Sequence, residues 1–250
     1  MTGINKPDPG TTIASVSDDK VRLSVIVPAY NEEELIEQTI GHLLATGKTC
    51  VEDLEIIIVN DGSHDRTPEI IDGMAEKHAA VRVFHQNPNR GFGATVRMGF
   101  EKATKDYVMV CPVDYQFTLE DFDIYLALIK HADIVIGYRR HRRENLPLYR
   151  YMVSTIYHLF VNILFRLNFF DVNWIHMYRR ERLPLFMGQS DGVFLLAENL
   201  IRAKNHGLKI IGVDVSYIER AAGVATGIKP TTILTTVGEL IAFFLKGRNG

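Results

Sequence analysis

The chain has 250 residues, of which 46% are hydrophobic and 23% charged, an ordinary composition for one large globular domain or two small ones. Its net charge of −2 provides no basic field and argues against nucleic acid as a partner. A helix that spans a bilayer needs about 18 or more uninterrupted apolar residues, and no apolar run of this sequence reaches that length. The sequence therefore predicts no helix that clearly spans a bilayer.

Residues 1–20 are rich in Gly, Pro, Thr, Ser and Asp, which predicts a flexible tail rather than a signal peptide. The two cysteines, Cys50 and Cys111, lie far apart and outside any C-x-x-C pair. This is typical of free, buried thiols in a reduced intracellular protein. We therefore expect a cytoplasmic protein whose folded part begins near residue 21.

From there, short apolar runs alternate with segments of helical pattern. The expected strands cover residues 23–27, 55–59, 81–84, 107–111 and 133–136. The expected helices between them cover residues 32–46, 66–78, 92–104 and 120–131. Continuously apolar strands that alternate with helices are typical of an α/β sandwich, in which a mainly parallel sheet is covered on both faces.

After residue 145 the pattern changes to long apolar helices. Residues 148–169 predict one helix, whose wide apolar face is interrupted by a stripe of His158, Asn162 and Arg166. The remaining expected elements are a helix over 192–206, a strand over 209–217 and a helix over 231–246.

Polar residues cluster where three of the expected strands end. Residues 28–33 read P-A-Y-N-E-E, residues 60–65 read N-D-G-S-H-D, and residues 112–116 read P-V-D-Y-Q. Ligands of open α/β sheets bind beyond the carboxyl ends of the strands, so the three clusters form one site if the strands are neighbours. Taken alone, Asn31 is a typical N-cap for the first helix, and Asp61-Gly62 is a typical turn.

Two glycines open the expected helix at 92–104, in the segment N-R-G-F-G-A-T-V-R. A dinucleotide fingerprint would need a third glycine where Val96 stands, and an acidic partner at the next strand end; both are missing. Two alternatives stay open. The segment either binds a phosphate at the amino end of the helix, beside Arg90, or simply starts the helix.

The segments V-I-V-P-A-Y-N-E-E, I-I-I-V-N-D-G-S-H-D-R-T, N-R-G-F-G-A-T-V-R-M-G-F and V-D-Y-Q follow one another in this order. Together they resemble the GT-A glycosyltransferases of family 2, and more nearly the polyprenyl-phosphate branch of dolichyl-phosphate mannose synthase type. The resemblance implies an inverting hexosyltransferase that uses a GDP- or UDP-linked sugar. It implies a GT-A domain over 21–230, with an amphipathic helix in 231–250 after it.

The resemblance also implies where the nucleotide binds. The expected nucleotide-binding residues are Pro28, Tyr30, Glu32, Asp61, Gly91 and Val113. Of these, the first three would line the base and ribose, and Asp61 would accept a hydrogen bond from the base. An aspartate contacts guanine or uracil equally well, so the donor base stays open.

In the family, a D-x-D-x-Q segment binds a divalent cation that bridges the diphosphate. Here Pro112 stands at the first aspartate, with Asp114 and Gln116 at the other two positions. The resemblance thus implies Mg²⁺ or Mn²⁺ held by Asp114 and Gln116, with Asp114 as a catalytic residue, since Mg²⁺ often takes few protein ligands. The alternatives are arginine-driven catalysis without metal, or an inactive site.

Four residues of the second half match the acceptor-phosphate residues of the branch. They are Arg139 after I-G-Y, Arg150 and Ser154 in R-x-x-x-S, and Arg220 in I-E-R-A-A-G. The resemblance implies that they bind a lipid phosphate and that Arg139 also contributes to catalysis. A phosphate oxygen is already a nucleophile, whereas a hydroxyl acceptor would need a general base.

The broad apolar faces of 148–169 and 231–246 favour a protein bound peripherally at the cytoplasmic face of a membrane. Ordinary core packing and an interface between copies in a homo-oligomer are the alternatives.

The chain also departs from the family. W-I-H-M at 174–177 replaces a run that usually ends in a basic residue, so His176 either replaces that residue or lies in the core. Glu198 is either structural or the base for a hydroxyl acceptor. The alternatives to lipid-phosphate glycosylation are accordingly a transferase with a soluble hydroxyl acceptor and a non-catalytic nucleotide-sugar-binding protein.

Overall fold

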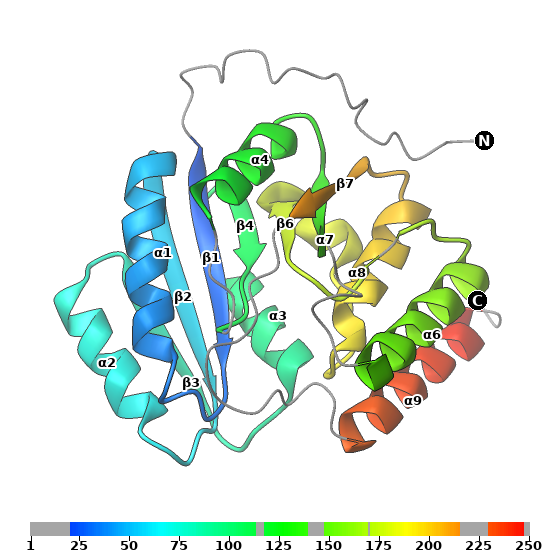
Figure 1. Cartoon of the computed structure of the whole chain (residues 1–250), viewed down its shortest axis with the longest axis horizontal. Coiled ribbons are helices and arrows are strands. Elements are labelled where there is room, and N and C mark those ends of the chain that lie inside the picture. The colour runs from blue at the N-terminus through cyan, green and yellow to red at the C-terminus, as the bar shows by residue number, and fades with distance from the viewer. Residues whose placement is uncertain (1–20, 114–117, 140–147, 170, 216–229, 248–250) are drawn as a thin grey trace.

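The computed structural model describes residues 21–113, 118–139, 148–169, 171–215 and 230–247, which form a sheet between layers of helices (Figure 1). The strands are β1 (Arg22–Ala29), β2 (Asp53–Asp61), β3 (Val81–Gln86), β4 (Tyr107–Val110), β5 (Ile134–Arg139), β6 (His176–Arg179) and β7 (Ile210–Val215). The helices are α1 (Ile36–Cys50), α2 (Thr67–Lys77), α3 (Phe92–Lys102), α4 (Leu119–Ile129), α6 (Leu148–Phe165), α7 (Leu183–Phe186), α8 (Phe194–Asn205) and α9 (Pro230–Gly247), with a 3₁₀ turn at Arg180–Arg182.

The seven strands of the described residues lie in the order β3-β2-β1-β4-β6-β5-β7. All neighbouring pairs are parallel except those of β6, which runs antiparallel to both β4 and β5. The expected α/β sandwich with a mainly parallel sheet is therefore confirmed. The sequence analysis missed β6, because its four residues, H-M-Y-R, lack a β-branched apolar run.

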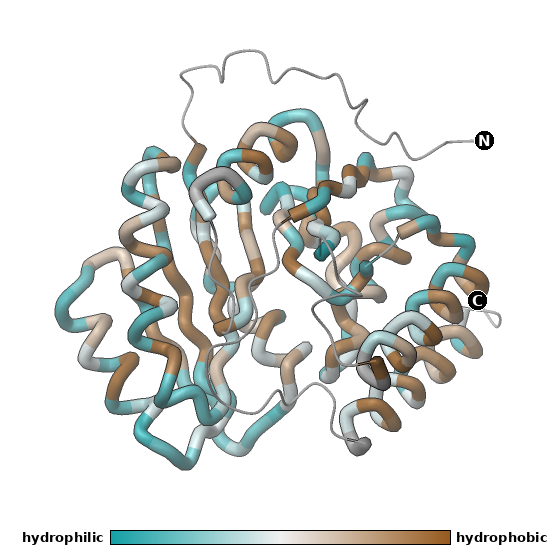
Figure 2. The backbone as a smooth tube through the Cα atoms, viewed as in Figure 1, coloured by the Kyte–Doolittle hydropathy of each residue, from teal (hydrophilic) through white to brown (hydrophobic). Residues whose placement is uncertain are grey.

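The sheet separates two hydrophobic cores, and this explains why its strands are continuously apolar (Figure 2). In β2, Ile56 and Ile58 face the core under α1, α2 and α4. Ile57 and Val59 face the core on the other side, under α3 and α8. Successive side chains of a strand point to opposite faces, so a strand buried on both sides has no polar face.

Two of the predicted helices have different ends in the structure. The first helix begins at Ile36 rather than near residue 32, and Asn31 is not its N-cap. Residues 32–35 form a turn closed by the Leu35 amide, which donates to the Glu32 carbonyl (3.1 Å), and Asn31 adopts a left-handed φ of 54°. The helix predicted over 148–169 ends at Phe165, followed by Arg166 at a φ of 51°.

Helices α6 and α9 lie side by side at one end of the molecule (Figure 1). The ring of Phe165 lies 5.7 Å from that of Phe243 and 5.9 Å from that of Phe244. No helix within the described ranges combines the length and apolarity that crossing a membrane requires. The predicted tail at 1–20 lies outside the described residues. Neither cysteine forms a disulfide; Cys111 is buried as expected, whereas Cys50 is only half-buried.

Candidate active site

The carboxyl ends of three neighbouring strands meet at one edge of the sheet. Strand β1 is flanked by β2 and β4, so the chain reverses its direction of strand addition here. Beyond β4, the Cys111 amide donates to the Ile26 carbonyl (2.9 Å), and the Thr39 hydroxyl donates to the Val113 carbonyl. The expected convergence of the strand ends is thus present up to Val113. Asp114 and Gln116 lie outside the described residues.

Hydrogen bonds join the loop that follows β1 to the loop that follows β2. The Asn31 amide donates to Ser63 Oγ (2.9 Å), and its side-chain Oδ1 accepts from the His64 amide (2.8 Å). The Glu32 amide donates to Thr67 Oγ1 (2.8 Å). Three of the expected nucleotide-binding residues, Pro28, Tyr30 and Glu32, are partly exposed and lie in or next to these hydrogen-bonded loops, which we call the braced rim.

Asp61 lies deeper, at the end of β2, with only 4% of its surface exposed. Its Oδ1 accepts from the Arg90 amide (2.7 Å) and its Oδ2 from the Gly91 amide (2.9 Å). Burial raises the pKa of this carboxyl, and the two amides act in the opposite direction. The structure thus brings Asp61 and Gly91 together. A hydrogen bond from a nucleotide base would add to the contacts that Asp61 already makes.

The turn at Gly91 and Gly93, where α3 begins, packs against a loop at 188–193 that the sequence analysis did not single out. The Gly93 amide donates to the Asp191 carbonyl (2.6 Å), so this amide already has a protein partner rather than pointing to a phosphate. The Arg97 guanidinium reaches the Ser190 carbonyl and the Asp191 carboxylate. A Cβ on Gly93 would lie 2.2 Å from the Ser190 carbonyl oxygen, so the approach requires glycine.

Glu198 fixes the same loop from α8. Its buried Oε2 accepts from the Gln189 amide (3.0 Å), the Ser190 amide (2.9 Å) and the Ser190 hydroxyl (2.7 Å). Arg202 donates to its other oxygen at 2.8 Å. Burial alone would raise the pKa of Glu198, but these donors lower it below its usual range. Of the two interpretations of Glu198, this geometry favours the structural one.

On the other side of the edge, Arg139 ends β5 in a mostly buried setting. Its Nε lies 2.7 Å from Oδ2 of Asp171, whose side chain is 3% exposed. The guanidinium carbon lies 4.6 Å from the centre of the Trp174 ring. The carboxylate and the ring together fix the orientation of the guanidinium fork.

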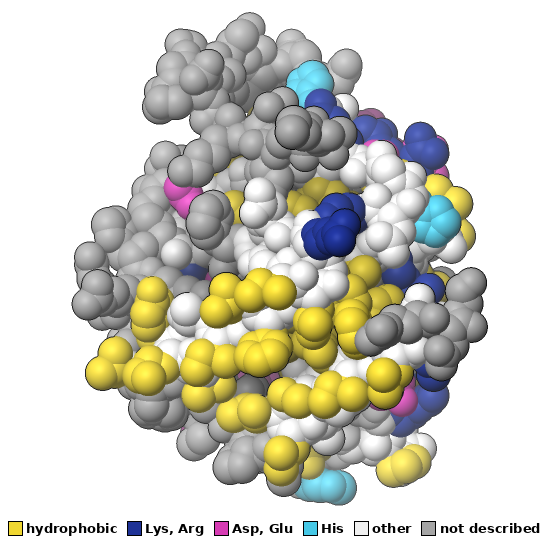
Figure 3. All heavy atoms as spheres, turned by 90° about the vertical axis from the view of Figure 1, so that its right-hand side faces the viewer, with side chains coloured by type: hydrophobic (Ala, Val, Ile, Leu, Met, Phe, Trp, Pro, Cys, Tyr) yellow, Lys and Arg dark blue, Asp and Glu magenta, His cyan; other side chains and the backbone are white. Residues whose placement is uncertain are grey.

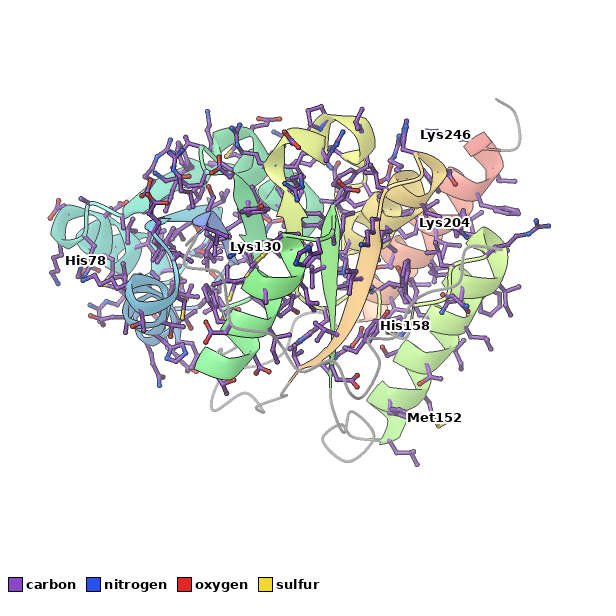
Figure 4. The ribbon with its side chains drawn as sticks, turned by 90° about the horizontal axis from the view of Figure 1, so that it is seen from above. His78, Lys130, Met152, His158, Lys204 and Lys246 are labelled. Carbon is purple, nitrogen blue, oxygen red and sulfur yellow. The ribbon has the colours of Figure 1, made fainter. Side chains whose placement is uncertain are left out.

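The same carboxylate reaches α6. Asp171 Oδ1 lies 3.2 Å from Nε2 of the buried His158, whose Nδ1 lies 3.4 Å from the Ser154 hydroxyl. Figure 4 shows His158 on the side of α6 that faces the sheet. Two expected acceptor-phosphate residues, Arg139 and Ser154, are therefore linked through Asp171 and His158. Arg150 lies in the first turn of α6 with its side chain not described, and Arg220 lies outside the described residues.

His176 does not replace the missing basic residue. It is fully buried in β6, and its Nδ1 lies 2.7 Å from the Tyr178 hydroxyl. Burial lowers its pKa to about 3, which keeps the ring neutral at physiological pH. The core interpretation of His176 therefore fits the structure.

The described residues contain no group of three or more His, Cys, Asp or Glu side chains placed to hold a metal ion. The expected ligands Asp114 and Gln116 lie in the segment outside these residues. The metal site therefore stays a prediction.

Solved structures with the same architecture include those of glucosyl-3-phosphoglycerate synthase from Mycobacterium tuberculosis. A complex with Mn²⁺, UDP and glucosyl-3-phosphoglycerate matches with a TM-score of 0.69 and 17% identity, over 96% of this chain and 86% of that one. A complex with Mg²⁺ and UDP matches with a TM-score of 0.68 and 17% identity, over 89% and 79%. At this identity the likeness establishes the fold, which is GT-A as expected.

Sequence relatives are lipid-phosphate glycosyltransferases. The undecaprenyl-phosphate mannosyltransferase of Micrococcus luteus is 28% identical over 81% of this chain and 86% of its own length. The dolichyl-phosphate beta-glucosyltransferase of Drosophila melanogaster is 33% identical over 58% of this chain and 49% of its own length, so the chain spans about half of that relative. Residues 24–184 match the model of glycosyl transferase family 2, and the chain therefore belongs to this family.

Proposed function

We propose that this chain transfers a hexose from a GDP- or UDP-linked sugar to a polyprenyl phosphate, with inversion, at a membrane surface. The named relatives support the acceptor, because their names specify undecaprenyl phosphate or dolichyl phosphate. The nucleotide is expected at the braced rim, which carries Tyr30 and Glu32, and at the deeper Asp61.

One observation carries the acceptor assignment. Arg139 from β5 and Ser154 from α6 are joined through Asp171 and His158 on the sheet-facing side of α6. A guanidinium fork and a hydroxyl are the groups that recognise a phosphate by charge-assisted hydrogen bonds. A site for a neutral hydroxyl acceptor would not need this fork.

The opposite side of α6 supports a lipid surface as the place of action. Rows of hydrophobic side chains cover the face formed by α6 and α9 (Figure 3). Members that are each at least 40% exposed are Leu148, Met152, Val153, Ile156, Leu159, Phe160 and Ile163 of α6, and Leu234, Val237, Ile241 and Leu245 of α9. We call this set the apolar face. Helices of this kind lie in the interface of a bilayer, and here the expected phosphate ligand Ser154 lies on the same helix.

A divalent ion fits the chemistry of the expected ligands. Asp114 and Gln116 offer a carboxylate and an amide oxygen, which hard cations prefer. Val113, whose carbonyl is held by Thr39, starts this segment at the junction of the strand ends. Mg²⁺ or Mn²⁺ bound there would neutralise charge on the departing diphosphate. The chain's own contribution is to hold the acceptor phosphate with Arg139 and Ser154.

Sugar transfer by the purified protein tests the proposal. GDP-mannose and UDP-glucose are offered with undecaprenyl phosphate in vesicles, or with soluble sugars, in Mn²⁺, Mg²⁺ or EDTA. We expect a lipid-extractable product from one donor, no transfer in EDTA, and a loss of about 10²–10³-fold in kcat in Asp114→Asn, since a group that stabilises developing charge is removed. The exposed Asp123→Asn on α4 is the matched control and should keep full activity.

Other outcomes would contradict parts of the proposal. Transfer only to soluble sugars would replace the lipid phosphate by a hydroxyl acceptor. Tight nucleotide binding without turnover in either metal would point to the non-catalytic interpretation. Full activity in EDTA would exclude the metal, and catalysis would then depend on arginine side chains.

A further inference from the structure

Ser154, His158 and Asp171 form a continuous array that phosphate binding alone does not explain. The imidazole of His158 lies between a hydroxyl 3.4 Å from Nδ1 and a carboxylate oxygen 3.2 Å from Nε2. The side chains of His158 and Asp171 are 5% and 3% exposed. A proton on Nε2, the nitrogen nearer the carboxylate, leaves Nδ1 to accept from the Ser154 hydroxyl. An arrangement of this kind moves a proton from hydroxyl to imidazole.

The acceptor of the proposed function still carries a proton on part of its molecules near neutral pH. A phosphate monoester loses its second proton at a pH of about 6. Near neutral pH the acceptor is therefore a mixture of monoanion and dianion. The dianion is the better nucleophile, and it is also the form that arginine binds more strongly.

We infer that His158 removes the remaining proton of the acceptor phosphate through Ser154, an inference that rests on the proposed function. The phosphate O–H bond breaks as its proton passes to Ser154 Oγ, and the hydroxyl proton of Ser154 passes to Nδ1 of His158. The products are a phosphate dianion, a neutral serine and an imidazolium. Ser154 then donates to the phosphate oxygen and accepts from the imidazolium. After the product leaves, the proton returns to water by the same path.

The surrounding charges favour this transfer. Asp171 carries a negative charge between Arg139 from β5 and the imidazole from α6, so it stabilises the imidazolium. Tyr157, whose ring centre lies 5.6 Å from that of His158, stays neutral because burial raises its pKa. His176 from β6 stays neutral because burial lowers its pKa to about 3. Among the described groups around Asp171, His158 is thus the one placed to take the proton.

The test is the pH dependence of kcat/KM for undecaprenyl phosphate in wild type and His158→Gln, from pH 5 to 8.5. Glutamine keeps polar contacts but takes no proton, so only the dianion reacts. At pH 5 about a tenth of the phosphate is dianionic, so the variant should fall about tenfold below its own value at high pH, and its loss relative to wild type should be largest there. At pH 8.5 the loss should shrink to about twofold or less, because nearly all acceptor is dianionic. If the ratio of kcat/KM in His158→Gln to kcat/KM in wild type does not change with pH, the inference is overturned.

Further variants separate this role from a structural one. Ser154→Ala interrupts the same path on a half-buried helix position and should show the same pH trend. His85→Gln is the matched control, because His85 also lies 3.1 Å from a carboxylate, that of Asp72, yet belongs to β3. The kcat/KM of His85→Gln, divided by that of wild type, should stay constant with pH. A difluoromethylene phosphonate acceptor, with a more acidic phosphate group, should restore His158→Gln at pH 5.

The two levels of the proposal fail separately. A wild-type protein that transfers nothing to a phosphate acceptor contradicts the proposed function. A wild-type protein that does transfer, with unchanged pH profiles in His158→Gln and Ser154→Ala, contradicts only the proton path.

Discussion

Gly93 has to be glycine because neighbouring backbone atoms leave no room for a side chain, and not because of its backbone conformation. Its missing side chain lets the start of α3 approach the carbonyls of Ser190 and Gly192, where a Cβ would lie 2.2 and 2.7 Å away. Both neighbours are backbone atoms of a loop that Arg97, Glu198 and Glu239 hold in place. An added methyl group therefore has to displace the loop or the helix.

We expect Gly93→Ala to lower the free energy of unfolding by about 1–3 kcal/mol, the cost of overpacking. Nucleotide binding should weaken too, because the neighbouring Gly91 donates its amide to Asp61, an expected nucleotide-binding residue. Urea denaturation and nucleotide titration measure both effects. Gly41→Ala is the control: nothing lies within 4 Å of its added Cβ, and alanine in a helix should stabilise by about 0.5–1 kcal/mol. Equal stabilities of the two variants would contradict the packing argument.

The sequence allowed the types of site residue to be predicted better than their partners. Strand-end residues such as Asp61 could be placed because the carboxyl ends of parallel strands meet at one edge. Asn31 was misassigned as an N-cap, since a cap and a loop-bridging turn use the same residue type. His158 and Asp171 are 13 positions apart in the sequence, and only the turn after α6 brings them together.

Helix α6 has two sides of opposite chemistry. The sheet-facing side carries Ser154, His158 and Asn162; the amide of Asn162 donates to the Phe169 carbonyl (2.7 Å) and closes the turn after the helix. The outward side belongs to the apolar face. A helix that lies on a bilayer with this outward side would hold a phosphate at the depth of the lipid headgroups.

Charged residues on the apolar face should release the protein from membranes. We expect Phe160→Glu to reduce binding to anionic vesicles by about tenfold or more in flotation, because a carboxylate is costly to bury in lipid. Transfer to a short, soluble prenyl phosphate should stay within about twofold. Leu185→Glu, at another exposed apolar position that lies on α7 and outside the apolar face, is the control and should still bind. If Phe160→Glu instead turns a dimer into a monomer and leaves flotation unchanged, the face is an interface between copies.

Long elements with a clear period could be predicted from the sequence, whereas two of the short ones could not. Helices α3, α8 and α9 lie within about two residues of their predicted bounds. Strand β6 and helix α7 have four residues each, too few to display a period.

At the scale of the whole sheet, Glu55 joins elements at the edge opposite the site. It accepts from the Ser24 hydroxyl of β1 (2.7 Å), from the Thr104 amide (3.0 Å) and from Arg82 of β3. Burial alone would raise its pKa, but these donors lower the pKa below the usual value of 4.5. The carboxylate is thus bound more favourably than the acid, and it contributes to folding stability only while ionised.

The lowered pKa of Glu55 sets the sign of a pH effect on stability. Its contribution is complete above about pH 4.5 and is lost as the pH falls through the lower, folded-state pKa. We expect Glu55→Gln to cost about 1–3 kcal/mol at pH 7, and less as the pH drops below about 4. Urea denaturation at several pH values measures this. The exposed Glu52→Gln should have almost no effect at any pH. A cost for Glu55→Gln that stays constant with pH would refute the assignment.

The insertion of β6 between β4 and β5 has a consequence for the emerging chain during synthesis. Strands β1 to β4 pair only with one another and with β6, so they can assemble as soon as residue 110 has left the ribosome. Strand β5 cannot join them, because its partners β6 and β7 are made later. We therefore expect the nascent protein to pair β1 to β4 first and to carry an unpaired β5, followed by the apolar α6, until β6 closes the sheet.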